Sequence, residues 1–223
     1  MKPDREQMLR EMGLGPVWKL RAPPAAAPGA SVAPVAAMAW DELAAAVVAC
    51  RACRLCEARK QAVLGVGDVN ADWLFVGEGP GAEEDQRGEP FVGQAGKLLD
   101  NMLAAIGLKR GEDVYIANAV KCRPPENRTP APEEAATCRP YLERQIELIQ
   151  PKLIIALGRP AAQTLLQAEI QIAAARGKLH DYRGIPLIVS YHPAYLLRTL
   201  LDKAKAWEDL CFMRRTMKSR KGD

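Results

Sequence analysis

Long apolar runs are missing from this sequence of 223 residues. No stretch reaches the length that a membrane span needs, and the first twenty residues lack the continuous apolar segment of a signal peptide. A strong excess of charge is missing too, because the net charge is only +4, and this value alone does not argue for a nucleic-acid partner. These absences predict a cytoplasmic protein that does not contact a membrane.

The common phosphate-binding motifs are also absent. Residues 77–81 read GEGPG, which has neither the glycine spacing of a dinucleotide-binding loop nor the Gly-Lys-Ser/Thr ending of a P-loop. Three glycines in five residues instead let the backbone turn tightly and come close to a ligand. The acidic residues behind this loop and the lone aromatic Phe91 suit a neutral planar ligand better than a pyrophosphate.

Hydrophobic residues make up 48% of the chain, which is enough for a core. Four short apolar runs are typical of buried strands, and helical patterns separate them. They lie at residues 74–76, 114–117, 153–157 and 185–189. Strands that alternate with helices predict one α/β domain with a parallel sheet. A further helix is predicted from Asp41, its N-cap, to about Val63.

The composition divides the chain into three parts. Residues 22–39 are rich in Ala and Pro and cannot bury enough surface to fold, so we expect residues 1–39 to be a disordered extension. The folded domain is predicted at residues 40–218, and a basic tail at residues 219–223. Residues 1–21 are either a tail without a role, a segment that packs on the folded domain, or a peptide that docks on a protein partner.

Unusual residues follow all four predicted strands. The carboxyl ends of parallel strands lie at one edge of a sheet, where open α/β sheets bind their ligands. The pattern therefore places Glu78, Phe91, Asn118 and His192 at one site, with the pair Gly158-Arg159 at the same edge.

Six cysteines in a reducing compartment indicate a metal site or catalysis rather than disulfides. Four thiolates suit a structural zinc ion or an iron–sulfur cluster, and the spacing alone does not choose between them. Cys56 adds a third thiol to the first group, and Cys211 is expected to be an ordinary buried cysteine. The candidate ligands are Cys50, Cys53, Cys122 and Cys138.

Five stretches resemble the family 4 uracil-DNA glycosylases, the iron–sulfur branch of the uracil-DNA glycosylase superfamily. They are residues 50–55 (CRACRL), residues 77–100 (GEGPGAEEDQRGEPFVGQAGKLLD), residues 118–128 (NAVKCRPPENR), Cys138 and residues 192–198 (HPAYLLR). The resemblance implies a three-layer domain in which helices flank a central four-stranded parallel sheet. It also implies a [4Fe–4S] cluster on Cys50, Cys53, Cys122 and Cys138, with a structural role, and leaves Cys56 as a non-ligand.

The resemblance further implies a monomer that flips uracil out of DNA and hydrolyses its N-glycosidic bond. Phe91 would stack on the uracil ring, Asn118 would read its O4 and N3–H, and His192 would hydrogen-bond O2 as the base leaves. Glu78 or Glu84 would orient the water, unless a dissociative path needs only electrostatic help. The glycines that would lie against the base are Gly77, Gly79 and Gly81.

Contacts with DNA are expected from basic residues that neutralise phosphates and from a side chain that enters the duplex as a wedge. Tyr195, Leu196 or Leu197 is the expected wedge. The expected phosphate contacts are Lys121, Arg123, Arg128 and Arg198. Two other readings of the sequence are a metal-dependent phosphohydrolase or electron-transfer protein, and a binder of damaged DNA that lacks catalysis or traps the base.

Overall fold

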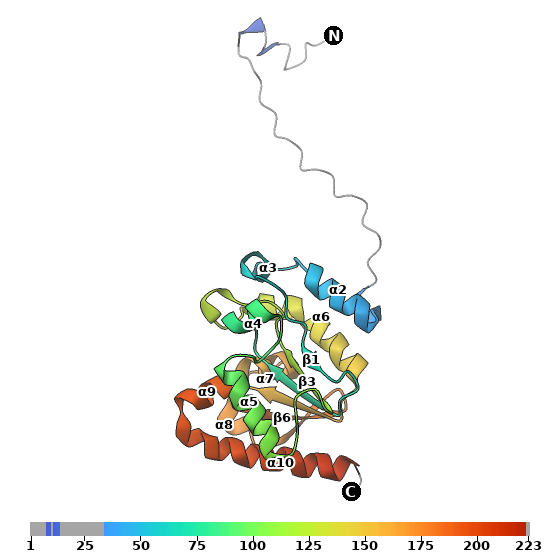
Figure 1. Ribbon diagram of the computed structural model, residues 1–223. Coiled ribbons are helices and arrows are strands. Elements are labelled where there is room, and N and C mark those ends of the chain that lie inside the picture. Colours follow the sequence, from blue (N-terminus) through green and yellow to red (C-terminus); the bar gives the residue numbers. More distant parts are fainter. Residues whose placement is uncertain (1–7, 10, 14–33, 222–223) are drawn as a thin grey trace. The chain divides into compact units, whose positions relative to one another are not determined.

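The computed structural model describes residues 8, 9, 11–13 and 34–221, which belong to two separate units (Figure 1). In the first unit the amide of Met12 donates to the carbonyl of Met8 at 3.1 Å, which makes a single helical turn. The predicted disordered extension and docking peptide lie largely outside the described residues.

The second unit is built on a six-stranded sheet with the strand order β1-β3-β2-β4-β6-β5. The four central strands are parallel, while β1 and β5 pair antiparallel at the two edges. The strands are β1 (Val66–Gly67), β2 (Trp73–Gly77), β3 (Val114–Asn118), β4 (Leu153–Leu157), β5 (Leu179–Tyr182) and β6 (Ile185–Ser190). The predicted four-stranded parallel sheet is confirmed as the centre of this larger sheet. The edge strands escaped prediction because they are short and carry no apolar run.

Helices pack on both faces of the sheet. The helices of this unit are η1 (Val35–Ala37), α2 (Trp40–Ala49), α3 (Leu55–Ala58), α4 (Ala82–Arg87), α5 (Gln94–Ala105), η2 (Pro125–Asn127), α6 (Pro132–Ile149), α7 (Arg159–Leu166), α8 (Ile172–Ala175), α9 (Pro193–Arg198), η3 (Leu200–Asp202) and α10 (Lys203–Lys221). Among the described residues, none of the helices is both long and apolar enough to span a membrane.

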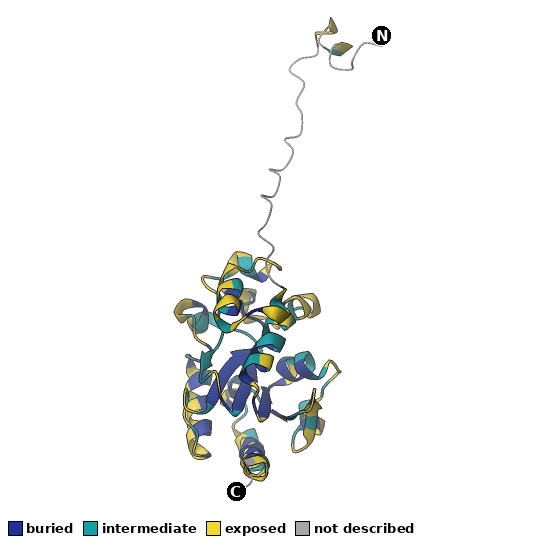
Figure 2. Ribbon diagram, turned by 90° about the vertical axis from the view of Figure 1, so that its right-hand side faces the viewer, coloured by how far each residue is buried: buried dark blue, intermediate teal, exposed yellow. Residues whose placement is uncertain are grey.

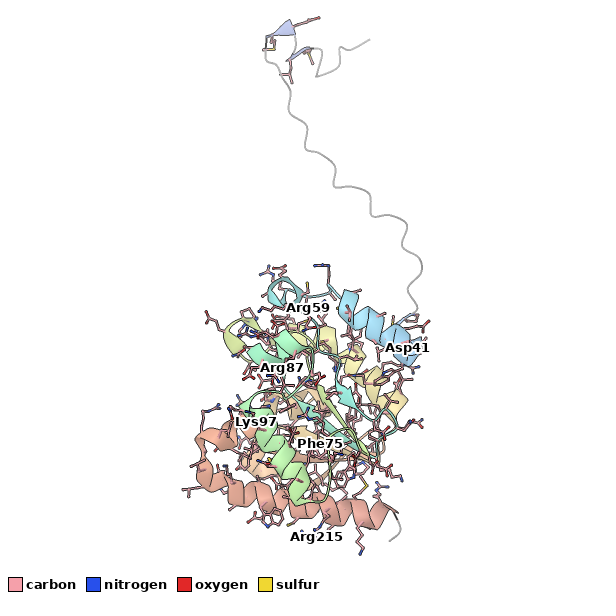
Figure 3. The ribbon with its side chains drawn as sticks, in the orientation of Figure 1. Asp41, Arg59, Phe75, Arg87, Lys97 and Arg215 are labelled. Carbon is pink, nitrogen blue, oxygen red and sulfur yellow. The ribbon has the colours of Figure 1, made fainter. Side chains whose placement is uncertain are left out.

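Side chains alternate between the two faces of each central strand, as the two-residue period of a strand requires. Phe75 of β2 packs with side chains of α5, α9 and α10 on one face, whereas Val76 packs with α6 and α7 on the other (Figure 3). Figure 2 shows the strands as a buried layer between helices whose outer sides are exposed. The three-layer architecture implied by the sequence is therefore confirmed.

The predicted helix from Asp41 to about Val63 is wrong. The helix α2 ends at Ala49, and Cys50 is extended with ψ 132°. The guanidinium of Arg59 accounts for this break, because its Nη2 donates to the carbonyls of Val48 (2.7 Å) and Cys50 (2.9 Å), which a longer helix would have used internally. The first cysteines therefore lie on a bend between α2 and α3.

The folded unit also extends beyond both predicted boundaries. Met38 is buried, and its carbonyl accepts a hydrogen bond of 2.7 Å from Arg144 on α6. At the other end, α10 continues to Lys221 and includes part of the predicted tail. The predicted boundaries at residues 40 and 218 are thus a few residues inside the folded unit.

Candidate uracil-recognition site

A pocket opens at the carboxyl ends of the parallel strands. It receives residues from the loops that follow β2, β3, β4 and β6, as the strand-end argument predicts. Ten predicted site residues line it: Glu78, Gly79, Gly81, Glu84, Phe91, Asn118, Arg128, His192, Tyr195 and Arg198. The topology thus brings together residues that are far apart in the sequence.

Gly77 lies directly beneath the aromatic and amide groups of this pocket. A Cβ atom at this position would be 2.5 Å from Cζ of Phe91 and 2.5 Å from Oδ1 of Asn118. Both distances are shorter than any ordinary contact, so only glycine allows these two side chains to approach the end of β2. The glycine here provides space for protein side chains as much as for a ligand.

The loop that carries Phe91 is held in a strained conformation. Phe91 has φ 55°, which is uncommon for a bulky residue. Arg110 fixes the loop from one side, because Nη1 donates to the carbonyl of Pro90 (2.8 Å) and Nη2 to that of Phe91 (2.7 Å). The backbone also passes so close to α5 that a Cβ on Gly96 would be 1.7 Å from the Phe91 carbonyl oxygen. The backbone contacts of this loop therefore fix the position of the Phe91 ring.

Glu84 fixes the same loop from the other side. Its Oε1 accepts hydrogen bonds from the amides of Val92 (2.9 Å) and Gly93 (3.1 Å), and its Oε2 accepts one from Gly81 (3.1 Å). Both carboxylate oxygens are thus used to join the glycine loop to the Phe91 loop. This geometry favours a positioning role for Glu84 over the predicted role of orienting water.

The ring of His192 stacks on that of Phe91, with the ring centroids 5.4 Å apart, and both residues line the pocket. Its Nδ1 accepts a hydrogen bond of 3.1 Å from the amide of Ala194, and the residue caps α9. Burial, together with the nearby charge of Arg198, lowers the pKa of His192 to about 4, while the charge of Glu84 acts in the opposite direction. At neutral pH the ring is therefore neutral, and its proton lies on Nε2, which remains available to donate to a ligand.

The low pKa of His192 predicts a loss of stability in acid. Between pH 6.5 and 4 the unfolded chain binds a proton at this ring and the folded chain does not, so the free energy of unfolding falls as the pH falls through this window. The expected loss is at most about 3 kcal/mol. Urea unfolding of wild-type protein and His192→Asn at both pH values measures it. An equal loss in both proteins would contradict the prediction.

Asn118 ends β3 opposite Gly77 in the parallel register. Its Oδ1 is buried and has no hydrogen-bond partner among the described residues. An unpaired buried acceptor costs about 1–3 kcal/mol, so its presence beside a pocket indicates that a ligand supplies the missing donor. This oxygen therefore indicates that the ligand of the pocket carries a hydrogen-bond donor.

Glu78 forms the wall of the pocket next to Arg159. Burial raises the pKa of Glu78, and a hydrogen bond with the Thr129 side chain and the charge of Arg159 act against this rise. Arg159 lines the pocket at the start of α7 but was not among the predicted site residues. The strand-end rule that revealed Asn118 and His192 had placed Gly158-Arg159 at the same edge, because the pair follows the end of β4, but it gave Arg159 no role in the site.

Two predicted DNA contacts lie in the core. Lys121 is 1% exposed and Leu196 is 1% exposed, so neither reaches a phosphate or enters a duplex. Leu196 faces inward because α9 packs on the sheet at this position, whereas Leu197 beside it is 41% exposed. These two predictions are corrected, and Leu197 remains the exposed apolar side chain of the segment.

The two arginines of the loop after β3 are tethered, and Arg128 is exposed while Arg123 is partly buried. Arg123 donates from Nε to Oδ1 of Asn127 at 2.8 Å. Arg128 forms a bidentate pair with Glu134, at 2.8 Å and 2.7 Å. These contacts order the loop at the rim of the pocket while the guanidinium groups remain near solvent.

The cysteines gather around a separate hollow between α2, α3 and α6. Its lining includes all four candidate ligands and also Cys56, which lies in α3. Two donors point at the sulfurs: Arg59 Nη1 lies 2.8 Å from Cys122 Sγ, and the amide of Lys121 lies 3.2 Å from Cys138 Sγ (Figure 3 shows Arg59 beside α3). In the described part of the chain, no three metal-ligating side chains lie close enough to hold a single metal ion.

Comparison with known proteins agrees with this geometry. The family model of the uracil DNA glycosylase superfamily matches residues 64–211. A type-4 uracil-DNA glycosylase from Archaeoglobus fulgidus is 48% identical over 165 residues, which cover 70% of this chain and 82% of that protein. A type-4 uracil-DNA glycosylase from Thermotoga maritima is 48% identical over 151 residues, covering 67% and 78%. This chain therefore belongs to the type-4 family of the uracil-DNA glycosylase superfamily.

Proposed function

We propose that this protein removes uracil from DNA by hydrolysing the N-glycosidic bond of a flipped-out deoxyuridine, which leaves an abasic site. The observation that carries the proposal is the unpartnered, buried Oδ1 of Asn118 beside Phe91 and His192. Uracil offers a flat face for Phe91, an N3–H for this oxygen and an O2 acceptor for the Nε2–H of His192. A phosphohydrolase would need none of these three features.

In this mechanism the chain acts mainly by positioning and by stabilising charge. Negative charge grows on uracil O2 as the bond to the sugar breaks, and the neutral His192 donates a hydrogen bond to it. Because His192 is already oriented by the Ala194 amide, little reorganisation accompanies this step. The pocket wall made by Phe91 keeps the base in place while the bond lengthens.

Glu78 is the carboxylate that we propose to lie near the sugar. It lines the pocket, and its side chain is not part of the hydrogen bonds that fasten the Phe91 loop. A hydrogen bond with the Thr129 side chain and the charge of Arg159 both favour its ionised form. It either orients the attacking water or stabilises the positive charge that develops on the sugar.

The cysteine hollow fits the [4Fe–4S] cluster that the family implies. Cys50, Cys53, Cys122 and Cys138 surround one space, and two N–H donors aim at their sulfurs, as is typical of cluster ligands. When bound, the cluster would supply a structural crosslink between α2, the loop after β3 and α6.

Ligand identity can be checked by single substitutions to serine. Cys53→Ser should lower bound iron and the visible absorbance strongly, because a cluster that loses one thiolate is held poorly. Cys211→Ser in α10 should leave the iron content unchanged, since this residue lies outside the hollow. Cys56→Ser tests whether Cys56, which also lines the hollow, is a ligand. Equal loss of iron in all three variants, or none in Cys53→Ser, would contradict the proposed ligand set.

The proposed activity has a direct test. Wild-type protein is incubated with a labelled strand that contains one uracil, in the presence of EDTA, and alkali then cleaves any abasic site. We expect cleavage at the uracil position only, and none on a strand in which thymine replaces uracil. Strand cleavage without alkali would instead indicate a nuclease, and binding without product would indicate a damage-binding protein.

Contacts with DNA and the oligomeric state are also proposals. We propose that Arg123, Arg128, Arg198 and Arg159 at the rim contact phosphates, that Tyr195 or Leu197 acts as the wedge, and that the protein is a monomer. Arg128, Arg159 and Arg198 are exposed and line the opening, which supports the first point, because each neutralised phosphate releases counterions and strengthens binding at low salt.

A further inference from the structure

Lys121 is a charged side chain that lies almost fully buried beside the cysteine hollow, with 1% of its surface exposed. Its Nζ donates to the backbone carbonyl of Asn118 at 2.8 Å and to Oε1 of Gln145 on α6. Both partners are uncharged. Burying an ammonium group among neutral acceptors is costly, and an apolar side chain of similar size would cost less. Lys121 also lines the cysteine hollow, where a negatively charged group would offset part of this cost, so its ammonium group lies between the hollow and the end of β3.

The backbone of Lys121 joins the same residue to the cysteine hollow. Its amide donates to Sγ of Cys138 at 3.2 Å, and its carbonyl accepts from the amide of Val63 at 2.8 Å. Cys122, a proposed cluster ligand, follows it directly. One residue thus contacts the cysteine hollow through its main chain and the uracil-reading strand end through its side chain.

The strand end needs such a support. After Asn118 the chain leaves β3, and the amides of Ala119 and Val120 bond to the carbonyls of Gly77 (2.9 Å) and Glu78 (3.1 Å). The carbonyl of Asn118 receives the bond from Lys121. The direction of the Asn118 peptide sets the direction of its side chain, and the selectivity of an amide for uracil depends on that direction to within a few tenths of an ångström.

Gln145 completes the connection on the side away from the pocket. Its Nε2 donates to the carbonyl of Leu64 at 3.0 Å and to the hydroxyl of Tyr115 at 3.3 Å. Tyr115 belongs to β3, three residues before Asn118. The ammonium group is therefore fixed between α6 and the strand whose end it supports, and it has little freedom to move.

We propose that Lys121 is a positioning residue for uracil recognition, which holds the Asn118 peptide through its ammonium group and anchors it to the cysteine hollow through its amide. The inference rests on the proposed function, because it assigns the reading of uracil to Asn118. Lys121 itself does not touch the base. It would act by keeping Asn118, with its unpaired Oδ1, in position before the base arrives.

Lys121→Met tests the proposal, because methionine fills the same space without a donor. We expect the affinity for free uracil, measured by calorimetry or NMR titration, to fall about tenfold, as expected for one hydrogen bond. The kcat/KM ratio for uracil over cytosine should also decrease, while affinity for DNA without uracil and the iron content stay unchanged. Lys152→Met is the matched control, since Lys152 lies at the start of β4, at the opposite end of the sheet, and is 50% exposed.

Gln145→Met provides a second variant if Lys121→Met does not fold. It leaves Lys121 and Asn118 in place but removes the acceptor that holds the ammonium, so a smaller loss in uracil affinity is expected. If the wild type is active and Lys121→Met binds uracil with unchanged affinity, the role of Lys121 is overturned and the proposed function stands. Where Lys121→Met does not fold, unchanged uracil affinity in Gln145→Met has the same meaning. A wild-type protein that releases no uracil would overturn the proposed function and this role together.

Discussion

Replacing His192 with alanine should reduce kcat for uracil excision by about 10²–10³-fold, the usual effect of losing one preorganised donor at a developing negative charge. The structure gives the reason: Nδ1 is occupied by the Ala194 amide, so the neutral ring presents Nε2–H to the pocket. Single-turnover kinetics on a uracil-containing strand measures the change. Binding of the same strand should weaken far less, because the donor acts mainly in the transition state.

His180→Ala is the matched control for this variant. His180 lies on β5, is partly exposed, and contacts the carbonyl of Ala175 rather than the pocket. It should excise uracil at the wild-type rate. A single-turnover rate within about threefold of wild type in His192→Ala would remove this residue from the mechanism.

Asn118→Asp should reduce the preference for uracil over cytosine at least about 100-fold in kcat/KM, most of it through loss of activity on uracil. A carboxylate cannot donate to uracil O4, and its charge is poorly tolerated in a site that is 2% exposed. The measurement compares strands that contain one uracil or one unpaired cytosine.

Asn101→Asp makes the same chemical change at an exposed position on α5. We expect its selectivity and its stability to match those of the wild type. If Asn118→Asp kept the wild-type ratio, the amide would not be the group that reads the base, and the assignment of the pocket would have to change.

The His192→Ala and Asn118→Asp variants each change one side chain of a pocket whose groups are fixed in place by the protein. Phe91, with its positive φ, is fixed by Arg110 and Glu84, while His192 is fixed by the start of α9. Each group is oriented by backbone contacts before a base is present. Such preorganisation is expected where a reaction is accelerated by placing groups rather than by an added nucleophile.

Several features followed from the sequence alone because they depend on local chemistry. The continuous apolar run at Leu153–Leu157 became a central strand, as expected for a strand that is covered on both faces. The residues after the strands met at one edge because parallel strands end together. Asn118 and His192 were therefore found without coordinates, and Arg159 was placed at the same edge in the same way.

Other features depended on contacts between distant segments, which no local pattern reveals. The helical pattern after Asp41 continues past Ala49, yet Arg59 captures the carbonyls of Val48 and Cys50 and ends the helix. Glu84 sits in an acidic run that suggests a solvated surface, but its carboxylate joins two loops. A charged residue in a basic motif, such as Lys121, was expected at the surface and lies in the core.

The sequence by itself determined the α/β class, the family and the set of residues at the strand ends, because strand periodicity and short motifs are encoded in consecutive residues. Only the tertiary structure decided which of these residues are free to meet a ligand and which are used to hold others. That distinction depends on burial and on hydrogen-bond partners, and both are set by segments that lie far apart along the chain.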